Sequence, residues 1–329
     1  MTNHFRLRML MALIVAAVMA TGIAACGSDD DSSDDGGSEE SADSNLIEEN
    51  ADNNAVKLTV GSKNFTEQIV LGEIYAQALE AAGYDVSTDL NLGSEVVALK
   101  ALEDGEISGY PEYTSTALTS FFKTAPEDVP ADGNEAIDQA QPEFEEKGLV
   151  AYAPTEFSSA NAVGLLAETA DELGVESISD LEGVSEDLDL YGSPECRQRI
   201  DCLVGLEENY GLEFNSFTPV DIGLRYEVLD KGDADLSILF TTDAQLYTDS
   251  ETYTILEDDQ GVLPAGNVTF VASQEAVDEA GPDLGETVEK VQGDLSLEVM
   301  QELNAKVDVD KEDPADAAQE YLQEYGYIE

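Results

Sequence analysis

The three cysteines are the side chains of this sequence that most directly suggest chemistry, and they lie in two different settings. Cys26 follows the small residues Ala24 and Ala25, a pattern in which the thiol becomes the nucleophile that takes up a diacylglyceryl group. Cys196 and Cys202 are separated by six positions and, in an exported chain, are expected to form a local disulfide. A bond that closes so short a loop removes little chain entropy, so we expect it mainly to fix the shape of the segment between the cysteines.

The single histidine, His4, lies in a stretch that has the features of a secretory signal. Two arginines precede an apolar run over 9–19, which is too short for a comfortable membrane span. Cleavage of residues 1–25 would remove His4, and with it any histidine base, catalytic dyad or histidine metal site. No phosphate-binding or dinucleotide-binding glycine motif is present. We therefore expect a protein that is not an enzyme and that binds no cofactor and no metal. An ordinary cleaved signal with an incidental Cys26 remains the alternative.

Acidic residues dominate the composition. The sequence has 72 Asp and Glu against 14 Lys and Arg, for a formal net charge of −58. A chain of this charge will not bind nucleic acid or an anionic membrane surface. Because the acids are spread along the whole length, the composition favours a solvated surface adapted to high salt, with a merely acidic extracellular protein as the alternative. Residues 26–55 have little apolar surface to bury, so a disordered, self-repelling linker is predicted there.

Alternating strand and helix patterns begin at Val56. The segment 56–110 reads as strand, helix, strand, helix and strand, which is typical of a doubly wound α/β fold. After Pro111 the chain enters a second unit, and from Thr241 it supplies a further α/β stretch. No internal repeat is visible in the sequence.

Three separated motifs carry a family resemblance. They are GSKNFTEQ over 61–68, EYTST over 112–116, and LEDDQG over 256–261 followed by Pro264. In this order they resemble the substrate-binding proteins of glycine betaine/carnitine/choline ABC transporters, and the similarity runs from about Val56 to the end of the chain.

The resemblance implies a type II periplasmic-binding-protein fold, in which two α/β lobes are joined by two crossover segments with a ligand cleft between them. The expected lobes are 56–110 with 241–329, and 111–240. The crossovers are expected near 110–113 and 240–242, so that residues there face the ligand.

An aromatic cage for a trimethylammonium group is also implied by the resemblance. A quaternary ammonium has no N–H to donate, so it is recognised by the negative π faces of aromatic rings. Position by position, the cage maps onto Tyr113, Tyr226 and Phe240. A fourth family aromatic aligns with Leu99, whose aliphatic side chain would weaken the cage or admit a different head group.

The basic residues are so few that each one is informative. Lys63, in the first strand-to-helix turn, and Arg199, between the two cysteines, are expected to bind the carboxylate of a betaine. Thr116 and Thr241 are expected to add hydroxyl donors. The disulfide would hold Arg199 in place. The alternative for both basic residues is a salt bridge with one of the many carboxylates.

The leading hypothesis is an extracytoplasmic, lipid-anchored and monomeric binding protein. It would capture glycine betaine or a relative for osmoprotective uptake and deliver it to an ABC permease and its ATPase. One alternative keeps the fold but takes another small solute, such as an amino acid. A second alternative is a surface lipoprotein without a transport role.

Overall fold

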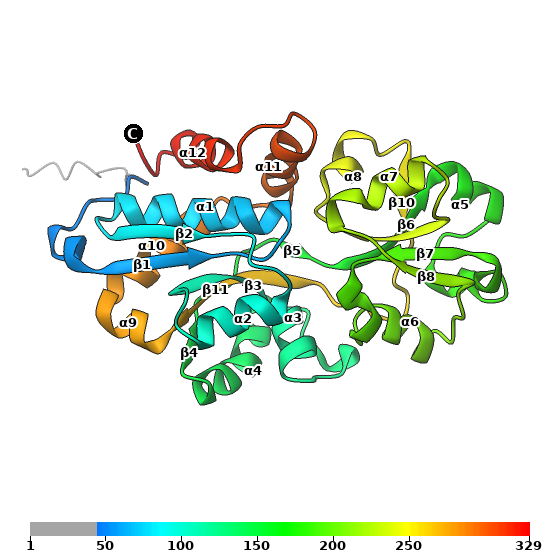
Figure 1. The fold of residues 1–329 in the computed structure, drawn as a ribbon, viewed down its shortest axis with the longest axis horizontal. Coiled ribbons are helices and arrows are strands. Elements are labelled where there is room, and N and C mark those ends of the chain that lie inside the picture. The colour runs from blue at the N-terminus through cyan, green and yellow to red at the C-terminus, as the bar shows by residue number, and fades with distance from the viewer. Residues whose placement is uncertain (1–44) are drawn as a thin grey trace, which may run out of the picture. The chain divides into compact units, whose positions relative to one another are not determined.

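The computed structural model describes residues 45–329, which form two α/β lobes, each built around one sheet (Figure 1). Lobe 1 comprises 45–159 and 266–329, and lobe 2 comprises 160–265. The strands of lobe 1 are β1 Lys57–Gly61, β2 Asp85–Asp89, β3 Gly109–Tyr113, β4 Leu149–Ala151, β5 Ser158–Ser159 and β11 Gly266–Ser273. The strands of lobe 2 are β6 Asn161–Leu166, β7 Asp189–Gly192, β8 Ser216–Pro219, β9 Leu236–Phe240 and β10 Tyr253–Ile255.

Helices cover both faces of each sheet. Those of lobe 1 are η1 Ala51–Ala55, α1 Thr66–Ala81, α2 Glu95–Glu103, α3 Thr114–Thr116, η2 Ala117–Phe121, η3 Pro126–Asp128, α4 Gly133–Glu146, α9 Gln274–Ala280, α10 Pro282–Gln292, α11 Leu297–Asp308 and α12 Pro314–Glu324. Those of lobe 2 are α5 Ala167–Leu173, η4 Ile178–Leu181, η5 Ser185–Asp187, η6 Pro194–Gln198, α6 Leu203–Glu208, η7 Ile222–Leu224, α7 Arg225–Asp230 and α8 Ala244–Thr248. The two α/β lobes inferred from the sequence are confirmed.

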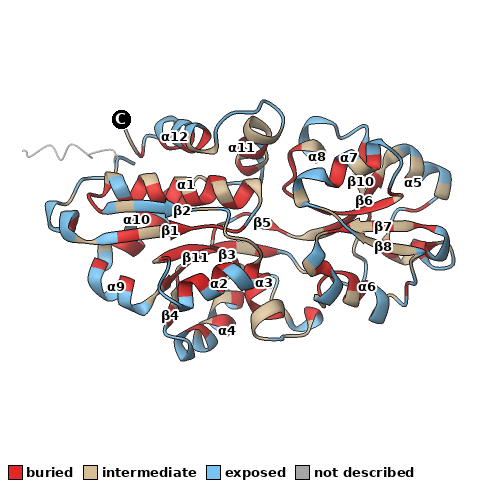
Figure 2. Ribbon diagram, in the orientation of Figure 1, coloured by how far each residue is buried: buried red, intermediate tan, exposed pale blue. Residues whose placement is uncertain are grey.

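The first strand and helix illustrate how burial selects these elements. Leu58 and Val60 of β1 point into the core of lobe 1, and the helix that follows, α1, is buried against the sheet and against α10 and α12 (Figure 2). Gly61 ends β1 where a Cβ atom would lie 2.5 Å from Ile107 Cδ1 and 3.2 Å from Leu92 Cδ1, so a larger residue would force these side chains to shift. The strand therefore turns directly into α1, and this turn faces the other lobe.

The boundary between the lobes differs from the one expected. The chain stays in lobe 1 after β3, because α3, α4 and β4 follow, and β4 pairs with β11 through Ala151 and Val271. It also stays in lobe 2 after β9, because β10 pairs with β6 through Tyr253 and Leu166. The predicted division into 56–110 with 241–329 and 111–240 is therefore wrong. Both strand pairings are long-range and leave no local signal in the sequence.

The start of the described chain also corrects an expectation. Residues 45–55 were included in the disordered linker, but they pack on lobe 1. The Asn50 side chain donates to Asp283 over 2.6 Å, and the buried Asn53 side chain donates to the Ala82 carbonyl over 3.0 Å. These side-chain amides find hydrogen-bond partners in lobe 1, so the polar composition of the segment is compatible with an ordered structure.

The predicted signal over 1–25, Cys26 and the rest of the linker to residue 44 lie outside the described residues. Over 45–329, no helix combines the length and apolar character that crossing a membrane requires.

Candidate functional site

A cavity lies between the lobes, at the carboxyl ends of the parallel strands. In lobe 1, β1 is parallel to β2 and β3, and in lobe 2, β7 is parallel to β8 and β9. The turns after five of these strands and Phe240, the last residue of β9, line the cavity, which lies at the strand ends where α/β sheets bind ligands. The space not filled by atoms is about 730 Å³, open solvent included.

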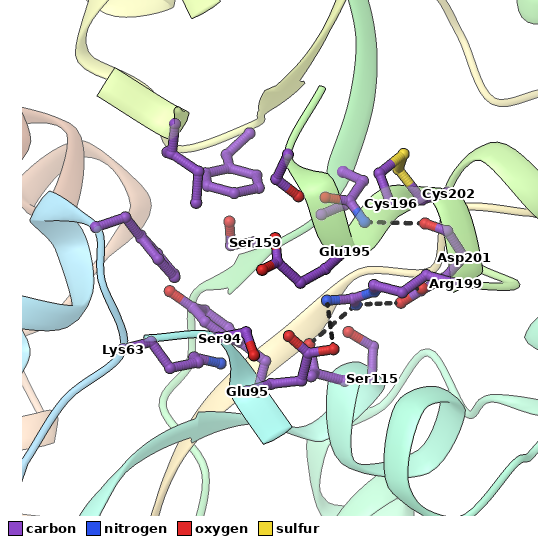
Figure 3. A pocket seen from close by; sticks show the side chains of 18 of the residues that line it. Lys63, Ser94, Glu95, Ser115, Ser159, Glu195, Cys196, Arg199, Asp201 and Cys202 are labelled. Atoms are coloured by element: carbon purple, nitrogen blue, oxygen red, sulfur yellow. Dashed lines mark hydrogen bonds and ion pairs between the residues drawn. A yellow bond between two sulfur atoms is a disulfide. The ribbon is translucent and has the colours of Figure 1, made fainter. Parts of the chain in front are cut away.

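Both lobes and both crossovers contribute to the lining. Lobe 1 contributes Lys63, Asn64, Phe65, Ser94, Glu95, Tyr113, Ser115 and Thr116. Lobe 2 contributes Ser193, Glu195, Cys196, Arg199, Asp201, Cys202, Ile222 and Phe240. The crossover segments add Ser159, Ala160, Asn161 and Pro264. Much of this set appears in close-up in Figure 3.

Three aromatic rings meet in this cavity. The ring centroids of Phe65 and Tyr113 are 6.3 Å apart with an interplanar angle of 14°. Those of Phe65 and Phe240 are 5.2 Å apart with an angle of 48°. The structure thus brings Tyr113 of lobe 1 close to Phe240 of lobe 2, with Phe65 contacting both. Phe65 was not among the predicted cage residues, although it lies inside the first family motif, two positions after Lys63.

Tyr226 and Leu99 are not among the residues that line this cavity. Tyr226 lines an adjoining cavity that shares Phe65 and Phe240 with this one; its hydroxyl is 3.1 Å from an Asp243 carboxylate oxygen, and its ring packs edge-on against Tyr253 with centroids 4.8 Å apart. Leu99 is buried in the core of lobe 1 and is not part of the lining. The family position at Leu99 therefore does not leave an aliphatic wall on this cavity.

Of the two threonines predicted to donate to the ligand, one lines the cavity and the other does not. Thr116 lines the cavity, and its hydroxyl oxygen lies 3.4 Å from Arg199 Nη2. Thr241 lies outside the lining, and its hydroxyl oxygen accepts a hydrogen bond from the Ala160 N–H over 3.1 Å. Thr241 therefore supports the crossover and is not a donor into the cavity.

Lys63 is buried beside the rings and is already paired. Its ammonium lies 4.4 Å from the Tyr113 ring centroid and 5.9 Å from that of Phe65, and it forms an ion pair with Glu112. The two partners are 4 % and 0 % exposed. Burial lowers the pKa of Lys63, and Glu112 acts in the opposite direction. The salt-bridge alternative for Lys63 is therefore the arrangement found.

Arg199 is also held by a carboxylate. Its Nε and Nη2 atoms donate to the two oxygens of Asp201 over 2.8 and 2.5 Å, a bidentate geometry that is strong and directional. Asp201 in turn accepts a hydrogen bond from the Thr119 hydroxyl of lobe 1 over 2.9 Å. Burial raises the pKa of Asp201, but the Arg199 guanidinium outweighs it and holds that pKa below its usual value.

The predicted disulfide between Cys196 and Cys202 is formed, with an S–S distance of 2.02 Å. It closes the segment that carries Arg199 and Asp201, and both sulfurs belong to cavity-lining residues (Figure 3). That the bond fixes the shape of this segment stays a prediction.

The rim of the Tyr113 ring is fixed by a hydrogen-bonded network. The Tyr113 hydroxyl donates to Glu67 over 2.6 Å, and Glu67 also accepts from the Asn304 amide over 2.9 Å. The same amide donates to the Thr242 carbonyl of lobe 2 over 2.9 Å. Burial raises the pKa of Glu67, and the hydrogen bonds it accepts act in the opposite direction. The network therefore ties the ring of lobe 1 to lobe 2.

Within residues 45–329, no group of three or more His, Cys, Asp or Glu side chains is arranged to hold a metal ion. The cavity instead combines aromatic faces with hydroxyls and paired charges. Such a surface suits reversible binding of a small cation or zwitterion, since rings attract cations through their quadrupole.

Comparison with known proteins assigns this geometry to a class. The family of substrate-binding domains of ABC-type glycine betaine transport systems matches residues 56–324, and the chain belongs to that family. This is a family of transport proteins and not of enzymes. The chain is therefore the extracytoplasmic substrate-binding component of an ABC transporter for solutes of the glycine betaine, carnitine and choline type.

Individual relatives agree. A glycine-betaine-binding protein of Pseudomonas aeruginosa is 31% identical over 286 residues, covering 84% of this chain and 90% of that protein. A carnitine transport binding protein of Listeria monocytogenes is 27% identical over 281 residues, covering 83% and 88%. The crystal structure of a glycine betaine/carnitine/choline ABC transporter protein is 26% identical, with a TM-score of 0.65, covering 83% and 100%. The periplasmic-binding-protein fold expected from the motifs is confirmed.

Proposed function

We propose that this chain captures a quaternary-ammonium compatible solute, such as glycine betaine or a relative, in the cavity between its lobes. The observation that carries the proposal is the meeting of Phe65, Tyr113 and Phe240. A trimethylammonium group can approach ring faces without losing a hydrogen bond, because it has none to give. Each desolvated cation–π contact contributes on the order of 2 kcal/mol.

Closure of the lobes on the ligand is the proposed mechanism. Phe65 and Tyr113 belong to lobe 1 and Phe240 belongs to lobe 2, so the three rings surround a head group only when the lobes approach each other. A ligand that contacts both lobes stabilises the closed state, which then docks on the permease and its ATPase.

The binding function is tested by isothermal titration calorimetry of the full chain with glycine betaine, carnitine and choline. We expect saturable binding of at least one of them, and Tyr113→Leu should weaken it at least about tenfold. Binding of an amino acid such as proline, with no heat from any trimethylammonium compound, would instead support the alternative ligand class. Absence of binding to all of these solutes would support a surface role without transport.

The lipid anchor and the osmoprotective role complete the proposal. A thioether-linked diacylglyceryl group on Cys26 would hold the protein at the outer face of the cell membrane, and we expect it to act there as a monomer. Cys26→Ala should move the protein from the membrane fraction to the medium. Retention of the variant at the membrane would contradict the anchor. Cells that lack the protein should lose ligand-dependent growth at high salt.

A further inference from the structure

The basic side chains of the cavity are already neutralised within the protein. Lys63 is paired with Glu112, and Arg199 is held by both oxygens of Asp201. Three of these four residues are at most 4 % exposed. A ligand carboxylate could reach the buried Lys63 only by displacing Glu112, which would leave that carboxylate unpaired. At Arg199 it would meet a guanidinium whose charge Asp201 already compensates.

A second cavity carboxylate is also engaged. Glu95, at the start of α2, accepts a hydrogen bond from the Ser120 hydroxyl over 3.0 Å and lies 3.9 Å from Arg199 Nη1. Arg199 therefore lies between two carboxylates, Asp201 and Glu95. These two acids compensate the positive charge of Arg199 and so weaken its attraction for a ligand carboxylate, although Nη1 forms no hydrogen bond with residues 45–329.

Glu195 differs from the other charged residues of the lining. It belongs to η6 of lobe 2, is partly exposed, and makes no hydrogen bond or ion pair with any residue in 45–329. Figure 3 shows its side chain projecting into the space between the labelled residues, while the neighbouring Arg199 is turned to Asp201. An unpaired carboxylate facing a cavity attracts a positive group and repels a negative one.

The net charge of the cavity lining is also negative. Its charged members are the bases Lys63 and Arg199 and the acids Glu95, Glu195 and Asp201. Glu112 adds a further acid in direct contact with Lys63. Two bases face four acids, so the lining keeps a negative charge after internal pairing. Glu195 is the carboxylate among these residues that is left to pair with a ligand.

We infer that Glu195 is a specificity-determining residue that pairs with the ligand's positive head group. It makes the cavity prefer a net cation such as choline over a carboxylate-bearing zwitterion such as glycine betaine. This inference rests on the proposed function, because the rings must hold the head group. It also reassigns Lys63 and Arg199 from ligand binding to internal pairing.

The test compares choline and glycine betaine by isothermal titration calorimetry with the full chain and two variants. The wild-type protein should bind choline about fivefold more tightly than glycine betaine, as expected for one partly solvated ion pair. Glu195→Gln should reduce this ratio to near one, mainly by weakening choline. Glu207→Gln removes the same charge from an exposed site of lobe 2 outside the cavity, and should leave the ratio unchanged.

Three outcomes would overturn the inference. The first is tighter binding of glycine betaine than of choline by the wild-type protein, which needs no variant and leaves the proposed function standing. The second is an equal loss of both ligands in Glu195→Gln. The third is an equal change of ratio in Glu207→Gln, which would assign the preference to the overall acidic field. If neither ligand binds the wild-type protein, the proposed function fails together with the inference.

Discussion

The two lobes share one strand order but differ in one turn: the turn that follows β1 in lobe 1 and the turn that follows β7, the strand at the same place in the order, in lobe 2. In lobe 1 the order is β2-β1-β3-β11-β4, and in lobe 2, read in the matching direction, it is β8-β7-β9-β6-β10. In each sheet one strand that adjoins a crossover is antiparallel to both its neighbours: β11 lies between β3 and β4, and β6 lies between β9 and β10. The sequence shows no repeat, so the shared topology depends on strand pairing and not on shared residues.

The lobes diverge at the turn that follows β1 in lobe 1 and β7 in lobe 2. In lobe 1 the chain passes from Gly61 to Thr66 and enters the 16-residue helix α1. In lobe 2 it takes a longer path from Gly192 to Leu203, closed by the disulfide, before the 6-residue helix α6. The short turn carries both a ring, Phe65, and a buried cation, Lys63, to the cavity, whereas the long turn carries charged residues and no ring. A loop with less helix to anchor it needs another constraint, and the disulfide supplies one.

The ends of β3 and β9 share one arrangement, in which a cation lies over an aromatic ring. Tyr113 ends β3 under the ammonium of Lys63, and Phe240 ends β9 with the Arg225 guanidinium 4.0 Å from its ring centroid. Each cation is paired with a buried acid close in sequence to the ring residue: Glu112, one residue before Tyr113 in β3, and Asp243, three residues after Phe240. Each lobe therefore fixes its ring with an internal cation before any ligand arrives.

The largest expected effect comes from breaking the Lys63 pair in lobe 1. Glu112→Gln leaves the Lys63 ammonium buried without its counter-charge, so we expect the free energy of unfolding to fall by about 3–5 kcal/mol. Urea denaturation at constant salt measures it. Asp243→Asn makes the matching change in lobe 2 and should have an effect of the same order. A loss below about 1 kcal/mol in both variants would contradict a structural role for these pairs.

The Arg199–Asp201 pair should give a smaller effect that depends on pH. Arg199 holds the pKa of Asp201 below its usual value despite burial, so the pair stabilises the folded protein above the usual aspartate pKa of about 3.9 and the contribution is lost as pH falls through the lower folded pKa. Asp201→Asn should therefore reduce the free energy of unfolding by about 2–3 kcal/mol at neutral pH. The difference from wild type should shrink below about pH 4. A difference that grows on acidification would contradict this sign.

Removing the disulfide tests what the long turn of lobe 2 requires. The double variant Cys196→Ser, Cys202→Ser should lose about 2 kcal/mol of stability, because the closed loop is short. Ligand affinity should also fall, since Glu195 is the residue directly before Cys196 and its position depends on the bond. Thermal unfolding and calorimetry measure the two effects separately. Unchanged affinity in a folded double variant would show that the loop keeps its shape without the bond.

The smallest expected effect separates the rings of the cavity from those outside it. Phe65→Leu keeps an apolar side chain but removes a ring face, so trimethylammonium binding should weaken by about 1–2 kcal/mol. Tyr226→Leu removes a ring that lines only the adjoining cavity, so ligand affinity should stay at the wild-type value even if stability falls. The reverse result would return Tyr226 to the binding site in place of Phe65.

The local elements of this fold could be predicted from the sequence because their signals are local. The alternation of strand and helix from Val56, the disulfide between Cys196 and Cys202, and the family motifs all lie within short windows. The motif positions also identified Tyr113 and Phe240, since each ends a strand whose carboxyl end faces the cavity.

Long-range contacts decided the rest. The sequence could not assign β4 and β10 to their sheets, because their partners, β11 and β6, lie far along the chain. It could not show that Tyr226 turns to Asp243 while Phe65 reaches the other two rings. The partners of Lys63 and Arg199 were open for the same reason: among 72 acidic residues, only the folded chain determines which carboxylates lie within reach.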